Sequence, residues 1–377
     1  MEKTLRVLQV LGTLNRGGAE SMIMNCYRNI DREIIQFDFV IHTNEACAFD
    51  SEIERLGGLI YHCPRYVVIN HFQYEKWWKD FFTAHKEYKI IHGHIRSTAR
   101  IYLKIAKYNG LYTIIHSHST SSGSGLKALT KDIYQIGITK NSDTKFACSR
   151  NAGEWLFRKK EFVIFPNAID ANMYIFEPKK RENIRKILHI EGRFVIGTVG
   201  RMAYPKNPFK IINIFKAIKQ KNKNAVLLWC GGGELKMKVE KRIIEEKLQD
   251  MVILAGIVNN VNDYMQAMDV FLFPSIYEGF SLVLVEAQVA GLPCIVSDSI
   301  TKEHAITDLI NFVSLSEPAE IWARKVRKYE NGYVRKNRRD DIFRAGYDIH
   351  TLTEWLTDFY VVSSKKYKDK TTSNLGT

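Results

Sequence analysis

The stretch VFLFPSIYEGFSLVLVEAQVAGLPCIVSD, residues 270–298, contains the repeating unit of the predicted fold. An apolar run (VFLFPS) is followed by a turn, by a helical stretch that starts near Ser281, and by a second apolar run (PCIVSD). Gly291 and Pro293 mark the end of the helical stretch. Strand, helix and strand in this order predict a βαβ unit, in which the two strands lie parallel in one sheet.

The same alternation continues along the whole chain in two series. The first series is RVLQVLG, FDFVIHT, IIHGH, TIIHSH, KFACS and FVIFP, and the second is FVIGTVG, AVLLWCG, MVILAG, VFLFPS and PCIVSD. A polar, lysine-rich stretch (EPKKRENIRK) separates them. We therefore expect two doubly wound α/β domains with a boundary near residue 178, and a frayed, flexible tail over residues 366–377.

Composition limits the classes of protein to consider. The apolar fraction is 45% in 377 residues, which suits two folded domains and excludes a disordered chain. The six cysteines contain no CxxC pair, so we expect neither a zinc site of that kind nor a disulfide framework, and a reducing cytoplasm is the simplest location. The first residues resemble a β-strand more than a signal peptide, and no apolar run is long enough to span a bilayer.

The formal net charge of +14 suits phosphate-rich substrates or an anionic membrane surface, or it is plain surface charge. No nucleic-acid-binding motif is present, so we expect no nucleic-acid partner.

Ligands of parallel sheets bind beyond the carboxyl ends of the strands, so residues that follow each apolar run are candidates for a site. Gly17 and Gly18 follow the first run and precede a helix. This turn either lets a phosphate or an anionic sugar approach free backbone N–H groups, or is merely a tight connection. It is not a GxGxxG fingerprint, which argues against a dehydrogenase.

The loop GRMAYPKNP, residues 200–208, brings Arg201 and Lys206 to the end of a strand in the second series. Pro205 and Pro208 stiffen this loop. Two cations in a rigid loop are a natural clamp for a diphosphate, whereas an exposed basic loop would not need the surrounding glycine and prolines.

Two glutamates, Glu278 and Glu286, lie eight positions apart at the ends of an apolar run. Ser281 is a plausible N-cap, so the N–H groups of residues 280–283 would face the strand ends and welcome an anion. About 7–8 Å of helical rise separates Ser281 from Glu286. The two carboxylates are therefore too far apart to share a proton but suited to hold two parts of one extended ligand, each accepting hydrogen bonds from a vicinal diol.

Two histidine pairs end neighbouring strands of the first series: His92 with His94, and His116 with His118. Alternate residues of a strand point to the same side, so His116 and His118 should point together. Zinc binding by the four histidines is conceivable, but no cysteine or carboxylate supports it nearby, and we expect no metal.

Taken together, these segments resemble a family-4 glycosyltransferase, a retaining enzyme of the GT-B fold with two Rossmann-like domains that face each other across a cleft. The resemblance covers nearly the whole chain, and it is most similar to the branch that builds bacterial capsular and exopolysaccharides. The matching segments are GGAE (17–20), HSHS (116–119), CSRNAGEWL (148–156), PNAID (166–170), GRMAYPKN (200–207), GGGEL (231–235), AMDVFLFPS (267–275) and the E-x7-E stretch (278–286).

The resemblance implies a nucleoside-diphosphate sugar as donor, with a UDP-sugar favoured, and a role for each matched residue. Arg201 and Lys206 would hold the diphosphate, Glu286 the ribose, and Glu278 the transferred sugar. His116 would lie beside the anomeric carbon, with His118 as the second candidate. The other donor contacts would come from Gly17, Gly18, Val258, Gly279, Phe280, Ser281 and Leu282, and the acceptor side from His94, His118 and Ser119.

The resemblance further implies that no metal cofactor is needed, because the clamp residues supply the positive charge. It implies a 1–178 acceptor-binding domain, a 179–345 nucleotide-sugar-binding domain, and a last helix over 346–365 that returns to the first domain. Two matches depart from the usual pattern, since Gly232 replaces a common aspartate and Ala168 a usual glycine.

The acceptor would be a saccharide, for example one linked to a polyprenyl diphosphate. The aromatic and basic stretch 74–89 either contacts an anionic membrane surface, which would make the protein a peripheral protein of the inner face, or is an ordinary helix that packs on the first sheet. We favour the ordinary helix.

Two other functions stay open at this point. A sugar-nucleotide epimerase of the GT-B fold would bind the same donor without an acceptor. A non-catalytic sugar-binding protein would bind without turnover, and would normally be exported.

Overall fold

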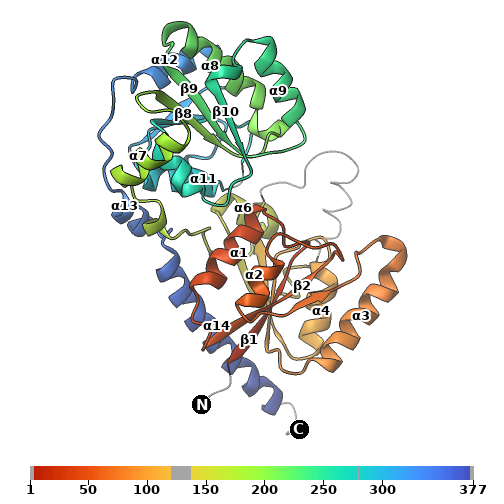
Figure 1. The fold of residues 1–377 in the computed structure, drawn as a ribbon. Coiled ribbons are helices and arrows are strands. Elements are labelled where there is room, and N and C mark those ends of the chain that lie inside the picture. The colour runs from red at the N-terminus through yellow and green to blue at the C-terminus, as the bar shows by residue number, and fades with distance from the viewer. Residues whose placement is uncertain (1–3, 120–136, 279, 374–377) are drawn as a thin grey trace. The chain divides into compact units, whose positions relative to one another are not determined.

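The computed structural model describes residues 4–119, 137–278 and 280–373. The chain forms two compact units (Figure 1). Unit 1 comprises residues 1–168 and 349–377, and unit 2 comprises residues 169–348.

Unit 1 is built on a seven-stranded parallel sheet with the order β3-β2-β1-β4-β5-β6-β7. Its strands are β1 (Leu5–Val10), β2 (Ile35–Ile41), β3 (Ile60–His62), β4 (Ile90–Gly93), β5 (Tyr112–Ser117), β6 (Thr144–Ala147) and β7 (Val163–Ile164). Its helices are α1 (Gly18–Asn29), α2 (Asp50–Arg55), η1 (Val68–Asn70), α3 (His71–Ala84), α4 (Ala99–Tyr108), α6 (Arg150–Phe157) and α14 (Ile349–Ser373).

Helices cover the sheet of unit 1 because its central strands are apolar on both faces. All seven residues of β2 are buried, as expected for an inner strand of a parallel sheet. Helix α14 supplies Ile349, Leu356 and Tyr360 to the same core as α1 and β1, although about 320 residues of chain separate them. In Figure 1 this last helix runs beside α1 and β1.

Unit 2 is built on a six-stranded parallel sheet with the order β10-β9-β8-β11-β12-β13. Its strands are β8 (Phe194–Val199), β9 (Ala225–Cys230), β10 (Val252–Gly256), β11 (Val270–Phe273), β12 (Cys294–Ser297) and β13 (Ile310–Val313). Its helices are η2 (Ala171–Met173), α7 (Pro178–Ile187), η3 (Tyr204–Lys206), α8 (Pro208–Lys221), α9 (Lys236–Glu245), η4 (Gln249–Met251), α10 (Val261–Ala267), α11 (Leu282–Val289), η5 (Lys302–His304), α12 (Ala319–Arg327) and α13 (Arg339–Arg344).

Both sheets reverse their strand order at one place, between β1 and β4 in unit 1 and between β8 and β11 in unit 2. Such a switch point leaves room beyond the carboxyl ends of the two strands, where ligands of open α/β sheets bind. The predicted fold class, two Rossmann-like doubly wound parallel sheets, is confirmed. The sequence did not predict β3 and β13, which are short strands at sheet edges.

The boundaries of the units differ from the predicted ones. The chain enters unit 2 at Ile169 and leaves it at Asp348, and these two residues form a parallel bridge. The residues from 169 to 178 therefore belong to unit 2, because this bridge and the contacts of η2 with α13 attach them there. Helix α14 begins at Ile349 and continues to Ser373, past the expected end at 365, because no Gly or Pro interrupts it before Gly376.

Candidate active site

The loop that carries Arg201 and Lys206 is held in place by the glycines that follow β9. The N–H of Gly200 donates to the Cys230 carbonyl (3.0 Å), and the N–H of Met202 donates to the Gly232 carbonyl (2.6 Å). A Cβ atom on Gly231 would lie 2.1 Å from the Gly200 carbonyl oxygen, and the φ angle of Gly231 is +147°. Only glycine allows this approach, so the triplet Gly231–Gly233 positions the predicted clamp.

Lys206 is paired with Glu278. The Lys206 Nζ lies 2.6 Å from the Glu278 carboxylate, and both side chains are largely buried. The same Nζ lies 4.7 Å from the centre of the Phe273 ring, which adds a cation–π contact. Asn207, which follows, has a φ angle of +54° and ends the short η3 turn. The structure thus places two predicted site residues, from the ends of neighbouring strands β8 and β11, in direct contact.

Arg201 is exposed, and its side chain makes no hydrogen bond or ion pair with any residue that the structure describes, although its backbone carbonyl accepts from the Ala203 N–H (2.9 Å). Arg201, Lys206, Phe273 and Ser275 line a small cavity at the end of β8. A cation without a counter-ion, next to a second cation at a switch point, suits a dianionic ligand group.

Ser281 occupies the predicted N-cap position of α11, but its side chain makes no capping hydrogen bond. Instead, its backbone N–H donates to Nε2 of His304 (2.8 Å), whose Nδ1 contacts the Thr301 carbonyl (3.0 Å). The prediction that the Ser281 N–H is free for an anion is therefore wrong. The N–H groups of Leu282 and Val283 have no partner within the helix, as in the first turn of any helix, and remain for a ligand.

Phe280 is enclosed by two rings. It stacks on His304 at a centroid distance of 4.7 Å and on Tyr347 at 4.9 Å. His304 therefore supports the turn through both a hydrogen bond and a stacking contact. It was not predicted from the sequence, because it lies 23 residues after Ser281 and belongs to no local pattern.

Glu286 lies on α11, one and a half turns after Ser281. Burial raises the pKa of its carboxyl group to about 7. A hydrogen bond from the Tyr174 hydroxyl lowers the same pKa, but by less. Its protonation therefore changes near neutral pH, which is common at functional sites. Tyr174, the partner of Glu286, was not predicted from the sequence either.

Of the two remaining donor-side predictions in unit 2, Val258 is half-buried and packs against the core cluster beside β10. Gly279 lies outside the described residues.

In unit 1, Gly17 and Gly18 lie at the start of α1, as predicted. Gly18 has open space around its Cα, since a Cβ there would contact nothing within 4 Å. Gly17 is covered by the carboxyl group of Glu20, whose pKa is raised by burial. A carboxyl group thus lies at the helix end where an anion was expected, and a ligand there would have to displace the Glu20 side chain.

The four histidines at the ends of β4 and β5 form one cluster. The rings of His116 and His118 stack at 4.1 Å, so the prediction that they point the same way is confirmed. His94 contacts His118 through its Nδ1 (2.9 Å), and its ring lies 4.4 Å from that of His92. His116 is 1% exposed, whereas His94, His118 and Ser119 are partly exposed.

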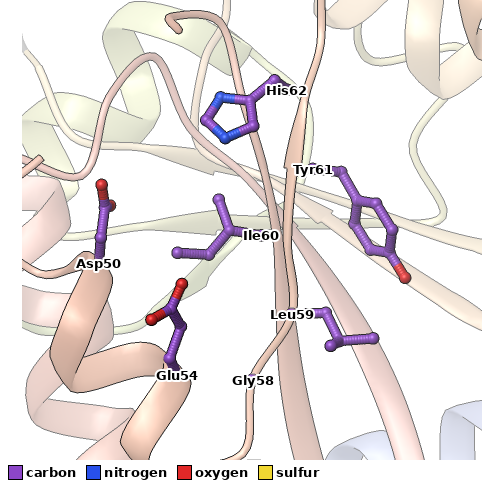
Figure 2. A pocket seen from close by; sticks show the side chains of 7 residues that line it. All are labelled: Asp50, Glu54, Gly58, Leu59, Ile60, Tyr61 and His62. Atoms are coloured by element: carbon purple, nitrogen blue, oxygen red, sulfur yellow. The ribbon is translucent and has the colours of Figure 1, made fainter. Parts of the chain in front are cut away.

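A surface hollow of unit 1 lies between α2 and β3 (Figure 2). Ile60 and His62 point toward Asp50 and Glu54 of α2, whereas Tyr61 points away, as alternation along a strand requires. No predicted site residue lines this hollow.

Comparisons with known proteins agree with this arrangement. The sequence profile of the family Glycosyl transferases group 1 matches residues 179–348, which is almost all of unit 2. The chain is 31% identical over 374 residues to the putative glycosyltransferase EpsF of Bacillus subtilis (strain 168), covering 96% of this chain and 97% of EpsF. It is 24% identical to the capsular polysaccharide biosynthesis glycosyltransferase CapH of Staphylococcus aureus, covering 95% and 99%.

A similar fold occurs in the crystal structure of Anabaena Alr3699/HepE in complex with UDP and glucose, with a TM-score of 0.77, 15% identity and coverage of 95% and 99%. Because EpsF matches over nearly its whole length, the similarity extends to both units of the chain. This chain therefore belongs to the group 1 glycosyltransferases and has their GT-B fold.

Proposed function

We propose that this glycosyltransferase moves a sugar from a UDP-sugar to a lipid-linked saccharide in the synthesis of a capsular or exocellular polysaccharide, with retention at the anomeric carbon. The observation that carries this proposal is the arrangement at the switch point of unit 2. There a pair of cations, the start of a helix and a carboxyl group surround the ends of β8 and β11.

In this proposal each group binds one part of the donor. The diphosphate lies between Arg201 and Lys206 and accepts from the N–H groups at the start of α11. The ribose hydroxyls bind Glu286. Because the diphosphate competes for Lys206, donor binding loosens the ion pair to Glu278 and leaves that carboxylate to accept hydrogen bonds from the transferred sugar.

In the transfer step, the bond between the anomeric carbon and the β-phosphate oxygen breaks while the acceptor oxygen bonds to the same carbon. The departing UDP oxygen takes the acceptor proton, so no further base is required. The two cations stabilise the negative charge that grows on the diphosphate, and in many enzymes such electrostatic stabilisation contributes most of the rate enhancement. The transfer therefore needs no metal ion.

On unit 1, we propose a histidine as a contact for the acceptor. The partial exposure of His118 favours it over His116, which reverses the order that the resemblance implied. Gly17, Gly18, His94 and Ser119 remain the other proposed contacts on unit 1.

The clamp is tested by substituting Arg201→Ala and Lys206→Ala and measuring transfer from UDP-sugars. We expect each substitution to lower kcat about 10²–10³-fold, as removal of one charge-stabilising donor does elsewhere. Lys241→Ala is the matched control, because Lys241 is an exposed cation of unit 2 on α9. Near-normal turnover in both clamp variants, with folding intact, would rule out the assignment.

A lipid-linked acceptor requires work at a membrane surface. A relative from Escherichia coli, 29% identical over 295 residues, is a UDP-Gal:alpha-D-GlcNAc-diphosphoundecaprenol alpha-1,3-galactosyltransferase. Among the residues that the structure describes, no helix combines the length and the apolar character needed to cross a bilayer. We therefore propose peripheral binding to the inner face of the membrane, and all six cysteines are free, as suits that reducing side.

The structure changes which residues are candidates for membrane contact. Trp78 and Tyr74 are fully buried and Phe81 and Phe82 nearly so, and α3 packs on unit 1 as the favoured alternative predicted. The exposed apolar side chains lie just before α3 and in its first turn: Val67, Val68, Ile69 and Phe72, which we call the apolar tip. Ile69 is 95% exposed and Phe72 84%. Lys76 and Lys79 follow Phe72 on the same face of α3, where they form exposed ion pairs with Asp80 and Glu75. Such exposed pairs are weak, so the two lysines remain able to contact anionic lipid beside the apolar side chains.

Membrane binding is tested by sedimentation with vesicles that contain anionic lipid. The double variant Ile69→Ser/Phe72→Ser should lose most of its vesicle-bound fraction. The control Met237→Ser, which removes an equally exposed apolar side chain from unit 2, should not. Equal sedimentation of both variants would refute a role for the apolar tip.

The epimerase alternative is separated from transfer by incubating the enzyme with the donor alone. An epimerase would convert the sugar nucleotide into an isomer, whereas the proposed transferase yields product only when a saccharide acceptor is present.

A further inference from the structure

The histidine cluster of unit 1 contains ring nitrogens that have no protein partner. Within the described residues, neither nitrogen of His116 forms a hydrogen bond, and Nε2 of His92 has none either. Both side chains are only 1% exposed. The backbone of Phe165 lies near the His116 ring, but it does not meet the geometry of a hydrogen bond. Leaving a buried polar atom unpaired costs about 1–3 kcal/mol, so two such rings side by side need an explanation.

The partners that the cluster does have are arranged as supports for metal ligands. Nε2 of His94 lies 2.9 Å from the side-chain oxygen of Gln9, which is only an acceptor, so this nitrogen carries the proton. The lone pair of Nδ1 then accepts from Nε2 of His118 (2.9 Å), a hydrogen bond that a bound metal ion would replace. Nδ1 of His92 lies 2.7 Å from the Tyr360 hydroxyl, which leaves Nε2 of His92 directed elsewhere. Histidines that bind metals usually donate their second N–H to such a partner, which fixes the ring.

The distances also fit. His92, His94 and His116 each offer one nitrogen, and these atoms lie within 4.8 Å of one another. Ligand nitrogens of a tetrahedral site with bonds of about 2.0–2.1 Å lie about 3.3 Å apart. Rotations of the side chains that close the gaps by up to about 1.5 Å would therefore complete the ligand set.

We propose that His92, His94 and His116 bind one divalent transition-metal ion of the zinc class, with water or His118 as the fourth ligand. A set of imidazoles without any carboxylate selects Zn²⁺, Co²⁺, Ni²⁺ or Cu²⁺ over Mg²⁺ and Ca²⁺. This set shares His94, and His118 where it serves as fourth ligand, with the acceptor side proposed above. The test below measures metal binding itself, so its result does not depend on whether the transfer proposal holds.

The test titrates Co²⁺ into metal-free protein and follows the visible absorption that tetrahedral Co²⁺ ligation produces, with Zn²⁺ displacement and calorimetry for stoichiometry. All samples carry Cys47→Ser, because Cys47 is the cysteine that is not buried. We expect one equivalent to bind. The variants His92→Asn and His116→Asn should weaken binding more than 100-fold, and Tyr360→Phe should weaken it about 10–100-fold.

His85→Asn is the matched control, since His85 is a partly exposed histidine of the same unit that pairs with Glu87. It should leave binding unchanged. Circular dichroism and the Tm in EDTA report whether each variant folds. Metal binding is compared for those of the variants His92→Asn and His116→Asn that pass this check. Absence of stoichiometric binding, or binding that the folded ligand variants retain, would overturn the proposal.

Discussion

The carboxyl group of Glu286 makes the folding stability of unit 2 depend on pH, and the variant Glu286→Gln tests this directly. Glutamine keeps the shape of the side chain and an oxygen that can accept the hydrogen bond from Tyr174, but it cannot ionise. The variant therefore removes the cost of ionising this buried group and little else.

The magnitude follows from the pKa of Glu286, which burial raises from 4.5 to about 7. Between these values the folded protein keeps the proton and the unfolded chain releases it, so stability falls as the pH rises from about 4.5 to 7 and is constant above. The difference between these two pKa values corresponds to about 3 kcal/mol. Because water reaches part of the side chain, we expect about 1–3 kcal/mol.

The assay measures urea unfolding of the wild type and the variant between pH 4.5 and 8.5. The two units can unfold separately, so the transition of unit 2 is followed, identified by the shift that added UDP produces. Relative to the wild type, Glu286→Gln should gain nothing near pH 4.5 and about 1–3 kcal/mol at pH 8. The control Glu303→Gln, an exposed carboxylate of the same unit, should show no such trend.

The same variant should lose affinity for UDP at pH 8, where the wild-type carboxylate can accept two hydrogen bonds from the ribose. A stability difference that is the same at every pH would refute the buried, proton-holding carboxyl group. Unchanged UDP affinity would refute the assignment of Glu286 to the ribose, whatever the stability data show.

Three further predictions concern other parts of the site. Gly231→Ala should lower both the Tm and kcat, since its Cβ would clash with the Gly200 carbonyl. The Cβ in Gly232→Ala would contact only a flexible side chain, so this variant should change the Tm and kcat little. Equal effects of the two substitutions would contradict the positioning role of the triplet. His304→Ala should destabilise unit 2 by about 1–3 kcal/mol in urea unfolding, because it leaves the buried N–H of Ser281 without an acceptor. An unchanged unfolding midpoint would show that water replaces the imidazole as the acceptor. Chelation of metal ions by EDTA should not lower turnover. A loss of turnover that Mg²⁺ or Mn²⁺ restores would disprove metal-free transfer.

The sequence predicted those parts of the fold that rest on local patterns. Most strands and their alternation with helices follow from runs of β-branched and apolar residues, and β8 and β11 were found in this way. Strand β13, with the sequence INFV, has the same length as β11 but was missed because the polar Asn311 interrupts its apolar run. A short run interrupted in this way cannot be told from a loop without its neighbours in the sheet.

The site was predicted where its residues are close in sequence and missed where folding joins distant segments. The loop with Arg201 and Lys206 was predicted from its glycine, its prolines and its charges. The pairing of Lys206 with Glu278 and the hydrogen bond from Ser281 to His304 join positions 72 and 23 residues apart, and they depend on the order of strands in the sheet. No local pattern carries that information.

The adjacency of Ile169 and Asp348 has a consequence for the synthesis of the protein. Unit 2 is one continuous segment whose two ends meet in a parallel bridge, whereas unit 1 takes Ile349, Leu356 and Tyr360 into its core from the last helix. The ribosome therefore makes most of unit 1 first but supplies its final core residues only after all of unit 2. At about 5–20 residues per second, the nascent first unit waits roughly 10–40 s with an incomplete core. During that interval its uncovered apolar face is a natural target for chaperones.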